Sequence, residues 1–345
     1  MEYIMRKMAT VRRIDELNPI EGADKIEVAT VGGWKVVCQK GLYNVGDLVV
    51  YCEIDSFIPT TVAPFLTKQG HYPKTYEGVE GERLRTVKLR GTTSQGLLLP
   101  LSGFDAYFNG AGEMFNEGDD VSSFLGIVKY EPPVSAQLAG VVKGSFPSQI
   151  PKTDQERCQN LKREIAAAVG NSFEVTEKLD GSSMTVYLLD GEFGVCSRNL
   201  NLKESEDNTF WRVARELDLE NKMHAMGDNL AIQGELIGEG IQKNPYNIKG
   251  QEFHVYDIYD VNKGDYLGPN QVQGFCYLAS LKHVPVIDAA CILSETDTVD
   301  RLLELAEGKS ILNPKTEREG LVFKSNNGGF TFKAISNKFL LKNGD

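Results

Sequence analysis

The first 130 residues contain many short apolar runs that alternate with polar positions and end at glycine or proline. The stretch "KIEVATVGGWKVVCQKG" alternates in this way and breaks at Gly-Gly, as a β-hairpin does. The runs "GDLVVYCEID", "RLRTVKLRG" and "QGLLLPL" indicate further short strands. Many short strands with glycine and proline between them predict a small β-barrel or sandwich.

A proline-rich segment separates this region from the rest of the chain. The segment "PPVSAQLAGVVKGSFPSQIP" begins at Pro132 and ends at Pro151. Proline fixes φ and has no amide hydrogen, so it interrupts helices and strands. We therefore predict a β-rich domain over residues 1–132, a linker over 133–152 and a second domain over 153–345.

The second half mixes helical and strand patterns. The stretch "TDQERCQNLKREIAAAVG" predicts a helix over 153–170, with a capping box from Thr153 to Glu156 and an end at Gly170. The stretch "GLVFKSNNGGFTFKAI" predicts a hairpin, because Asn-Asn-Gly-Gly lies between two apolar runs. Periodicity predicts further helices over 208–219 and 295–308, and strands over 173–180, 184–189, 192–197, 230–237 and 252–259. This order of elements indicates an α+β fold.

Composition is that of an ordinary globular protein, and it excludes several classes. The chain has 345 residues, of which 41% are hydrophobic and 25% charged. No apolar run approaches the length of a membrane-spanning helix, and the first residues lack the apolar core of a signal peptide. The six cysteines contain no CxxC pair, and the four histidines lack zinc-ligand spacing. These features predict a reducing, cytoplasmic or other intracellular location without secretion, and no heptad pattern indicates a dimer, so we expect a monomer.

The charge is acidic and unevenly distributed. The net charge is −11, of which residues 1–150 contribute −3 and residues 151–345 contribute −8. A chain with this charge does not hold nucleic acid by bulk electrostatics, so any nucleic-acid contact must be local. The excess acid in the second half is compatible with a solvated surface or with a site for divalent cations.

One short stretch, "EKLDGSS", combines the residues of a nucleophilic site. Lys178 and Asp180 are two residues apart, so an extended strand projects them to the same side. An amine must be neutral to attack, and a cation held by a nearby carboxylate favours the neutral amine. Gly181 lets the backbone turn close to a phosphate. An exposed Lys-x-Asp-Gly turn is the alternative interpretation of this motif alone.

Further short signals follow in order along the second half. Arg198 follows a strand in "CSRN", Glu235 lies in an apolar strand, and Phe253 alternates with Val255. Each has a plain structural alternative: a surface arginine, a rim glutamate and a core phenylalanine. The last signals are "EREGLVFKS" and "FTFKAISNK", which contain Glu319, Lys324, Lys333 and Lys338.

Taken in order, these motifs resemble those of the covalent nucleotidyltransferases, which comprise ATP-dependent RNA and DNA ligases and mRNA capping enzymes. Only twelve residues follow Lys333, so the OB domain that DNA ligases and capping enzymes carry after the last motif has no room. The small β domain lies in front instead, and Ser183 stands where DNA ligases have arginine. The chain is therefore similar to the Naegleria-type RNA ligase family, which has an N-terminal OB domain. This resemblance implies an OB-type barrel followed by an adenylyltransferase domain built on antiparallel sheets with flanking helices.

The resemblance also implies a reaction and a set of roles. Lys178 attacks ATP to form lysyl-AMP, AMP passes to an RNA 5′-phosphate, and a 3′-hydroxyl then seals the strand. Carboxylates that hold a hydrated Mg²⁺ or Mn²⁺ are expected to be Asp180, Glu235 and Glu319. Residues expected to contact the nucleotide or phosphates are Arg157, Glu177, Arg198, Phe253 and Lys333. Some relatives carry a second lysine where this chain has Ile335, and Lys338 is the candidate to replace it.

Three alternatives remain at this level. A DNA ligase or a capping enzyme shares the first chemical step and differs in its substrate. The third alternative is a non-catalytic RNA-binding protein, and it depends on the front domain. The stretches "ELNPIEGADKIEVATVGGWKVVCQKG" and "VKLRGTTSQGLLLPL" in this domain are similar to the OB module of tRNA-binding domains. That alternative predicts no covalent nucleotide on the chain.

Overall fold

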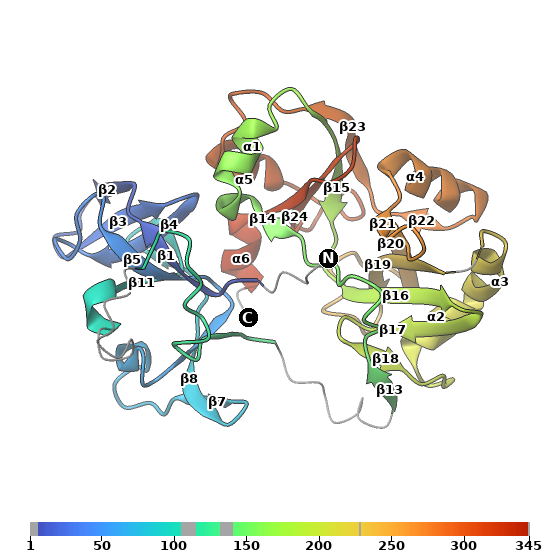
Figure 1. The fold of residues 1–345 in the computed structure, drawn as a ribbon, viewed down its shortest axis with the longest axis horizontal. Coiled ribbons are helices and arrows are strands. Elements are labelled where there is room, and N and C mark those ends of the chain that lie inside the picture. The colour runs from blue at the N-terminus through green and yellow to red at the C-terminus, as the bar shows by residue number, and fades with distance from the viewer. Residues whose placement is uncertain (1–5, 105–114, 132–140, 228, 344–345) are drawn as a thin grey trace. The chain divides into compact units, whose positions relative to one another are not determined.

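The chain divides into two compact units. The computed structural model describes every residue except 1–5, 105–114, 132–140, 228 and 344–345. The first unit comprises residues 1–132 together with two short segments, 159–162 and 340–345. The second unit comprises residues 133–158 and 163–339 (Figure 1). Each unit is described separately below.

The first unit consists of short antiparallel strands arranged in four small sheets. The sheets run β1-β5-β11, β2-β3-β4, β10-β9 and β12-β6-β8-β7. Their bounds are β1 (Ala9–Arg13), β2 (Glu16–Pro19), β3 (Ile26–Val31), β4 (Trp34–Gln39), β5 (Leu48–Cys52), β6 (Ser56–Pro59), β7 (Lys74–Tyr76), β8 (Val79–Arg83), β9 (Thr86–Leu89), β10 (Thr92–Gln95), β11 (Leu97–Pro100) and β12 (Val128–Lys129). Strand β5 pairs with β1 and β11, and its Val50 and Tyr51 are buried on opposite faces.

Two predictions for this unit have different outcomes. The hairpin across Gly32 and Gly33 is confirmed, because β3 and β4 pair from Ile26↔Gln39 to Val31↔Trp34. The single strand expected from "RLRTVKLRG" is wrong, because β8 ends at Arg83 and β9 begins at Thr86. Leu84, between these strands, is buried in the core, and its backbone amide donates to Ser56 O. The burial of Leu84 therefore breaks the predicted strand into β8 and β9.

The second unit is built on two sheets. The larger sheet runs β13-β18-β17-β16-β19-β20-β21, with β22 paired to β20, and the smaller one runs β14-β25-β24-β15-β23. Strands of the larger sheet are β13 (Val142–Ser145), β16 (Ser182–Leu189), β17 (Glu192–Cys196), β18 (Leu200–Leu202), β19 (Leu230–Gly238), β20 (Gln251–Asp260), β21 (Asp265–Tyr266) and β22 (Lys282–His283). Those of the smaller sheet are β14 (Glu156–Arg157), β15 (Ser172–Lys178), β23 (Val286–Ile292), β24 (Gly320–Ser325) and β25 (Thr331–Ile335).

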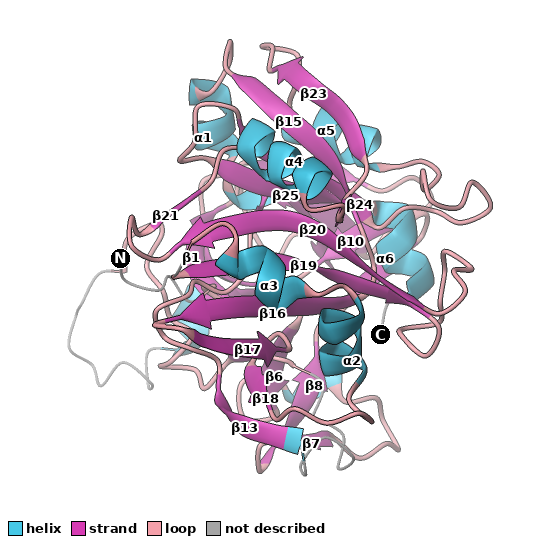
Figure 2. Cartoon of the chain, turned by 90° about the vertical axis from the view of Figure 1, so that its right-hand side faces the viewer, coloured by secondary structure: helices cyan, strands magenta, loops and turns pink. Residues whose placement is uncertain are grey.

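Helices cover one face of the larger sheet and flank the smaller one. They are α2 (Thr209–Glu216), α3 (Leu219–His224), α4 (Pro269–Leu278) and α5 (Val299–Ala306), whereas α1 (Lys162–Ala167) and α6 (Asn337–Asn343) contain residues of both units. Figure 2 shows α2 and α3 in front of β16 and β19. A core of side chains such as Val186, Trp211 and Phe275 fills the space between these helices and the sheet. None of the helices within the described residues is long and apolar enough to cross a membrane.

Several predictions for this unit are confirmed, and two need correction. The hairpin of β24 and β25 forms as expected, with Gly328 and Gly329 at positive φ in its turn. The helix over 153–170 is wrong: Glu156 and Arg157 form β14, and only Lys162–Ala167 is α-helical. Tertiary pairing of β14 with β25 overrides the helical pattern. The linker prediction is also wrong over 142–145, because β13 pairs with β18, while residues 133–140 of that linker lie outside the described residues.

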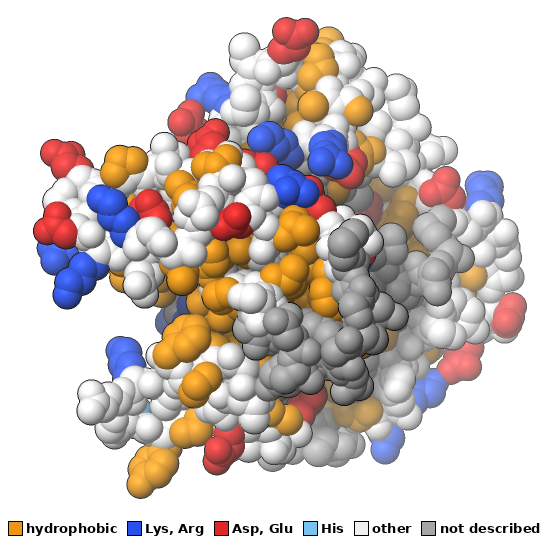
Figure 3. Space-filling model, turned by 60° about the vertical axis from the view of Figure 1, so that its left-hand side comes forward, with side chains coloured by type: hydrophobic (Ala, Val, Ile, Leu, Met, Phe, Trp, Pro, Cys, Tyr) orange, Lys and Arg blue, Asp and Glu red, His pale blue; other side chains and the backbone are white. Residues whose placement is uncertain are grey.

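The surface carries no continuous basic stripe on the face that Figure 3 shows. Lys and Arg side chains there stand singly or in small groups, with Asp and Glu side chains and apolar side chains between them. This distribution agrees with the acidic net charge of −11. Contacts with a polyanion must therefore be local.

Candidate active site

Lys178 lies where the chain passes from the smaller sheet to the larger one. It is the last residue of β15, and β16 begins at Ser182. The connection needs Gly181, because a Cβ there would come within 2.4 Å of Leu236 O on β19. Gly181 therefore lets the connection from β15 to β16 pass close to β19 in the larger sheet.

Glu319 forms an ion pair with Lys178. The Lys178 Nζ lies 2.7 Å from Glu319 Oε1, and the two side chains are 26% and 16% exposed. The pairing of β15 with β24 explains the contact, because Lys178 lies opposite Gly320, directly after Glu319. Two motifs that are far apart in the sequence are therefore adjacent through strand register.

Glu235 reaches the same place from β19. It lies opposite Ser183 of β16, and its carboxylate accepts a hydrogen bond from the Gly181 backbone N–H. Burial raises the pKa of Glu235 to about 8, with further contributions from Glu319 and Asp180, although Lys178 acts in the opposite direction. The three acids expected at the site therefore act on one another electrostatically around a single lysine.

The ammonium of Lys178 is stabilised by these acids. Burial by itself would lower the pKa of Lys178, but Glu319, Glu235 and Asp180 outweigh it and raise the pKa above the ordinary lysine value. A protonated amine is not a nucleophile. The three acids therefore favour the protonated, unreactive form of Lys178.

The loop after β19 supports the Lys178–Ser182 connection. The backbone N–H of Asp180 donates to Tyr246 Oη at 2.6 Å, and Gln242 Nε2 donates to Gly181 O at 3.0 Å. These bonds fix Asp180 beside the acids. Among the described residues, no three His, Cys, Asp or Glu side chains come close enough to hold one ion directly.

Arg157 and Lys333 share one face of the smaller sheet with Lys178. Arg157 pairs with Lys333, Lys333 with Val322, and Val322 with Thr176, which is two residues before Lys178. Directly paired residues point to the same side of a sheet, and so do residues two apart along a strand. Two cationic side chains predicted to contact phosphates thus lie on the face of the nucleophile.

Lys324 and Tyr256 belong to the same region, although sequence reasoning gave neither a role. Lys324 Nζ lies 2.7 Å from Asp257 Oδ1 and also donates to the Tyr256 carbonyl. The Tyr256 hydroxyl lies 3.3 Å from Ser183 Oγ, which is 3.3 Å from Thr153 Oγ1. Tyr256 is therefore an aromatic side chain on the side of the larger sheet that carries Glu235.

Phe253 lies on the opposite side of the larger sheet. It pairs with Leu236, whereas its neighbour His254 pairs with Glu235. Phe253 is 2% exposed and packs in the helix-covered core. The geometry does not support its expected contact with adenine, because the nucleotide would lie on the other face. Phe253 and Tyr256 are three positions apart and so lie on opposite faces of β20, which is the sequence signal that could have found Tyr256.

The carboxylate of Glu177 also points away from Lys178. Glu177 alternates with Lys178 along β15, and its Oε2 accepts from the Ile311 backbone N–H at 2.8 Å. Burial raises the pKa of Glu177, although hydrogen bonds from Ser310 and Ile311 act to lower it. The side chain therefore holds the segment after α5, and the structure does not bring it to the nucleophile.

Two remaining basic residues have local partners. Arg198 donates from Nη2 to both oxygens of Asp154, at 2.7 and 2.9 Å, in the segment before Arg157. Lys338 Nζ lies 2.5 Å from Glu307 Oε2, while Ile335 is buried opposite Gly320. The structure thus pairs Lys338 with an acid after α5, which gives no support to its role as a substitute for a lysine at position 335.

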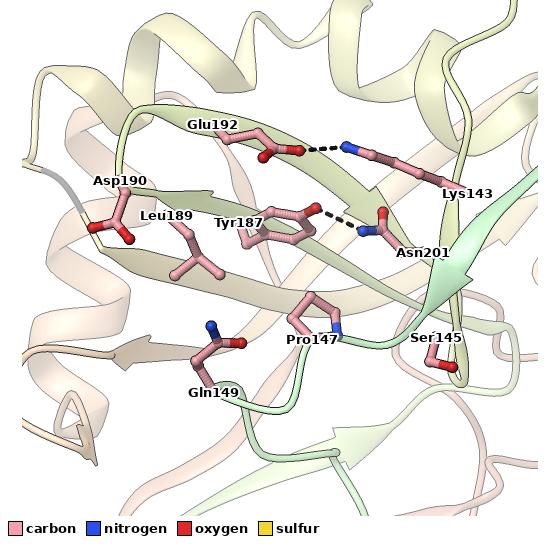
Figure 4. A pocket seen from close by; sticks show the side chains of 9 residues that line it. All are labelled: Lys143, Ser145, Pro147, Gln149, Tyr187, Leu189, Asp190, Glu192 and Asn201. Atoms are coloured by element: carbon pink, nitrogen blue, oxygen red, sulfur yellow. Dashed lines mark hydrogen bonds and ion pairs between the residues drawn. The ribbon is translucent and has the colours of Figure 1, made fainter.

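A pocket of about 370 Å³ lies elsewhere in this unit, and none of the predicted site residues lines it. Figure 4 shows Tyr187, whose hydroxyl accepts from Asn201 Nδ2 at 2.7 Å, and the ion pair of Lys143 with Glu192. These residues come from β13, β16, β17 and β18. Because it contains neither the nucleophile nor the clustered acids, this pocket is not the candidate active site.

Comparisons with known proteins agree with the geometry. A family model for an OB-fold domain matches residues 8–101, and one for RNA ligases matches residues 171–335. The chain is 46% identical to Naegleria gruberi RNA ligase in its solved structure with pyrophosphate. The match covers 99% of this chain and 100% of the Naegleria chain, and the TM-score is 0.89. It belongs to the RNA ligase family.

Other solved structures of the Naegleria gruberi ligase match this RNA ligase equally. One variant with ATP and manganese has a TM-score of 0.88, and another with AMP and manganese has 0.89. Each is 46% identical, covering 97% of this chain and 98% of that one. No curated protein matches the chain. The expected fold, an N-terminal OB domain followed by an α+β ligase domain, is confirmed.

Proposed function

We propose that this RNA ligase uses ATP to join a 3′-hydroxyl and a 5′-phosphate through a lysyl-AMP on Lys178. The observation that carries the proposal is the amine of Lys178 among three carboxylates, 2.7 Å from Glu319, at the junction of two sheets. The related Naegleria gruberi ligase has been solved with ATP, AMP, pyrophosphate and manganese. These are the ligands that such a reaction requires.

The acids fit a hydrated divalent cation. Asp180, Glu235 and Glu319 offer hard oxygen donors, and Mg²⁺ characteristically keeps several of its waters when it binds. Because no three described side chains hold one ion directly, we propose that the acids bind these waters. When bound, the cation supplies positive charge that offsets the three carboxylates and so favours the neutral amine.

In the first step, the lone pair of the Lys178 amine attacks the α-phosphorus of ATP. A P–N bond forms, the bond between the α-phosphorus and the bridging oxygen breaks, and pyrophosphate leaves. The amine must lose a proton, and Glu319 is the base in contact with it at 2.7 Å. Arg157 and Lys333, on the same sheet face, neutralise phosphate charge.

Tyr256 provides the aromatic face for adenine in this proposal. Its ring lies on the Glu235 side of the larger sheet, and its hydroxyl is held by the Thr153–Ser183 pair. Aromatic faces stack on nucleobases. This role replaces the one expected of Phe253.

The second and third steps transfer AMP and then release it. A 5′-phosphate oxygen of the RNA attacks the lysyl-AMP phosphorus, the P–N bond breaks, and the amine leaves. The 3′-hydroxyl oxygen then attacks the phosphorus of the adenylated 5′-phosphate, the anhydride P–O bond to AMP breaks, AMP departs, and the hydroxyl proton passes to water. Arg157 and Lys333 neutralise phosphate charge in each step, and a cation held by the acids would add positive charge there.

The test is covalent labelling with ATP that carries the label at the α-phosphate. We expect labelled polypeptide with the unaltered chain and Mg²⁺ or Mn²⁺, and none with Lys178→Ala. Lys338→Ala is the matched lysine control and should label normally, because Lys338 pairs with Glu307. Labelling of Lys178→Ala at the level of the unaltered chain would contradict the assignment. Chasing the labelled protein with nicked RNA, open RNA ends or nicked DNA then identifies the strand it seals.

A further inference from the structure

The β9–β10 hairpin of the N-terminal unit is basic in an acidic chain. Residues 83–104 contain no aspartate or glutamate, whereas the whole chain has a net charge of −11. The basic residues in this stretch are Arg83, Arg85, Lys88 and Arg90. Arg83 is used inside the unit, where its guanidinium pairs with Asp55 at 2.9 Å. The charge available for a partner is therefore concentrated on the hairpin.

The outer part of the hairpin is exposed. Val87 is 44% and Leu89 42% exposed, and Lys88 and Arg90 are exposed as well. Within the part of the chain that the structure describes, neither Lys88 nor Arg90 has an ion pair or a side-chain hydrogen bond. Two cationic side chains thus face solvent without compensation by acids of their own unit.

The turn of the hairpin carries an arginine in an unfavourable conformation. Leu89 pairs with Thr92, so Arg90 and Gly91 form a two-residue turn, and both have positive φ, 48° and 84°. Turns of this kind favour Asn-Gly, because a residue with a larger side chain resists positive φ. Strain of this sort tends to occur at functional positions, and here it places a guanidinium at the hairpin tip.

Lys88 and Thr93 form a second element of the surface. They are a directly paired cross-strand couple, so their side chains project from the same face of the ribbon within a few ångströms of each other. An ammonium and a hydroxyl side by side are both donors to an oxygen anion. Together with Arg90, they offer three donor side chains in a stretch, residues 83–104, that contains no acid.

We propose that the β9–β10 hairpin binds the phosphate backbone of the RNA substrate through Lys88, Thr93 and Arg90. The proposal rests on the proposed ligase function for its choice of partner. Charge complementarity supports RNA: phosphate oxygens accept from all three side chains, and an acidic chain must bind a polyanion at a local basic element. An acidic protein partner is the alternative that the test below separates.

The test measures binding of a nicked RNA duplex by the full chain over a series of salt concentrations. The double variant Lys88→Gln/Arg90→Asn removes both charges, and Asn suits the turn. Loss of two phosphate contacts should lower the slope of log affinity against log salt by roughly 1.4–1.8. At low salt, affinity should fall by about tenfold or more. The matched control Lys25→Gln/Lys203→Gln removes two exposed charges elsewhere and should keep the original slope.

The outcomes separate this proposal from the proposed function. Binding is measured without any chemistry, so absence of lysyl-AMP in the unaltered chain would count against the ligase reaction and not against the hairpin. An affinity and slope equal to those of the unaltered chain would overturn the hairpin proposal, and would favour a protein partner for this surface. Lys88→Arg/Arg90→Lys retains both charges and should restore the slope, which a merely structural role of the hairpin would not predict.

Discussion

Two lysine–carboxylate pairs on the same face of the smaller sheet have the same length and different surroundings. Lys178 lies 2.7 Å from Glu319, and Lys324 lies 2.7 Å from Asp257. Lys178 is 26% exposed and is surrounded by three acids, whereas the side chains of Lys324 and Asp257 are 11% and 12% exposed. Lys324 also donates to the Tyr256 carbonyl.

The difference shows that pair geometry alone does not reveal a role. Around Lys178 the excess of acid has access to solvent and attracts cations, so the pair can exchange partners during a reaction. Around Lys324 the partners are enclosed between β24 and β20, so the pair joins the two sheets. The Lys178–Glu319 pair is open to a substrate or cation, whereas the Lys324–Asp257 pair links the smaller sheet to the larger one.

The largest expected effect comes from breaking the enclosed pair. Asp257→Ala leaves the Lys324 ammonium buried without its carboxylate, which should lower the free energy of unfolding by about 3–5 kcal/mol. Denaturant unfolding monitored by circular dichroism measures this loss. Asp257→Asn/Lys324→Met removes both charges and should recover much of the stability; a double variant as unstable as Asp257→Ala would show that the pair is not the cause.

Breaking the open pair should affect chemistry rather than stability. Glu319→Gln removes the base beside Lys178 and one of the acids, and should reduce the rate of lysine adenylation by roughly 10²–10³-fold. Single-turnover labelling with ATP measures the rate, and Glu317→Gln, which pairs with Lys309, is the nearby control. A rate that stays within a few-fold of normal would remove Glu319 from the mechanism.

A smaller effect distinguishes Phe253 from Tyr256 on β20. Tyr256→Leu retains apolar volume but loses the ring face, so the KM for ATP should rise by roughly tenfold. Phe253→Leu, in the helix-covered core, should cost about 1 kcal/mol of stability and leave the KM unchanged. The reverse pattern, with the KM change at Phe253, would restore the role first expected for that residue.

The last expected effect concerns pH. Burial lowers the pKa of His283 to about 4, below the ordinary value of 6.5. Between these values the unfolded chain binds a proton that the folded chain does not, so folding stability should be complete above about pH 6.5 and fall as the pH drops toward 4. Thermal unfolding midpoints across this window measure the slope. His283→Gln should flatten the slope; a slope equal to that of the unaltered chain would rule out His283 as the source.

Much of the site was predictable from residue order. The motifs with Lys178, Asp180, Glu235 and Glu319 name residues that the structure gathers around one lysine. These residues could be predicted because short-range features reveal them in the sequence: the end of a strand, a glycine where two backbones come close, and a hairpin turn. The β24–β25 hairpin, with its two turn glycines, is the clearest such pattern.

The tertiary structure decided the remaining assignments. Within the helical pattern over 153–170, Glu156 and Arg157 became strand β14, because they pair with β25. Alternation along β20 does not say which face is covered, and only packing against α2, α3 and α4 placed Phe253 in the core and Tyr256 beside Glu235. Sequence determined which residues are candidates for the chemistry, since that depends on side-chain type and spacing. Which side of each sheet became the site was decided by strand register and by the helices that bury the other side, because burial is a property of the whole fold.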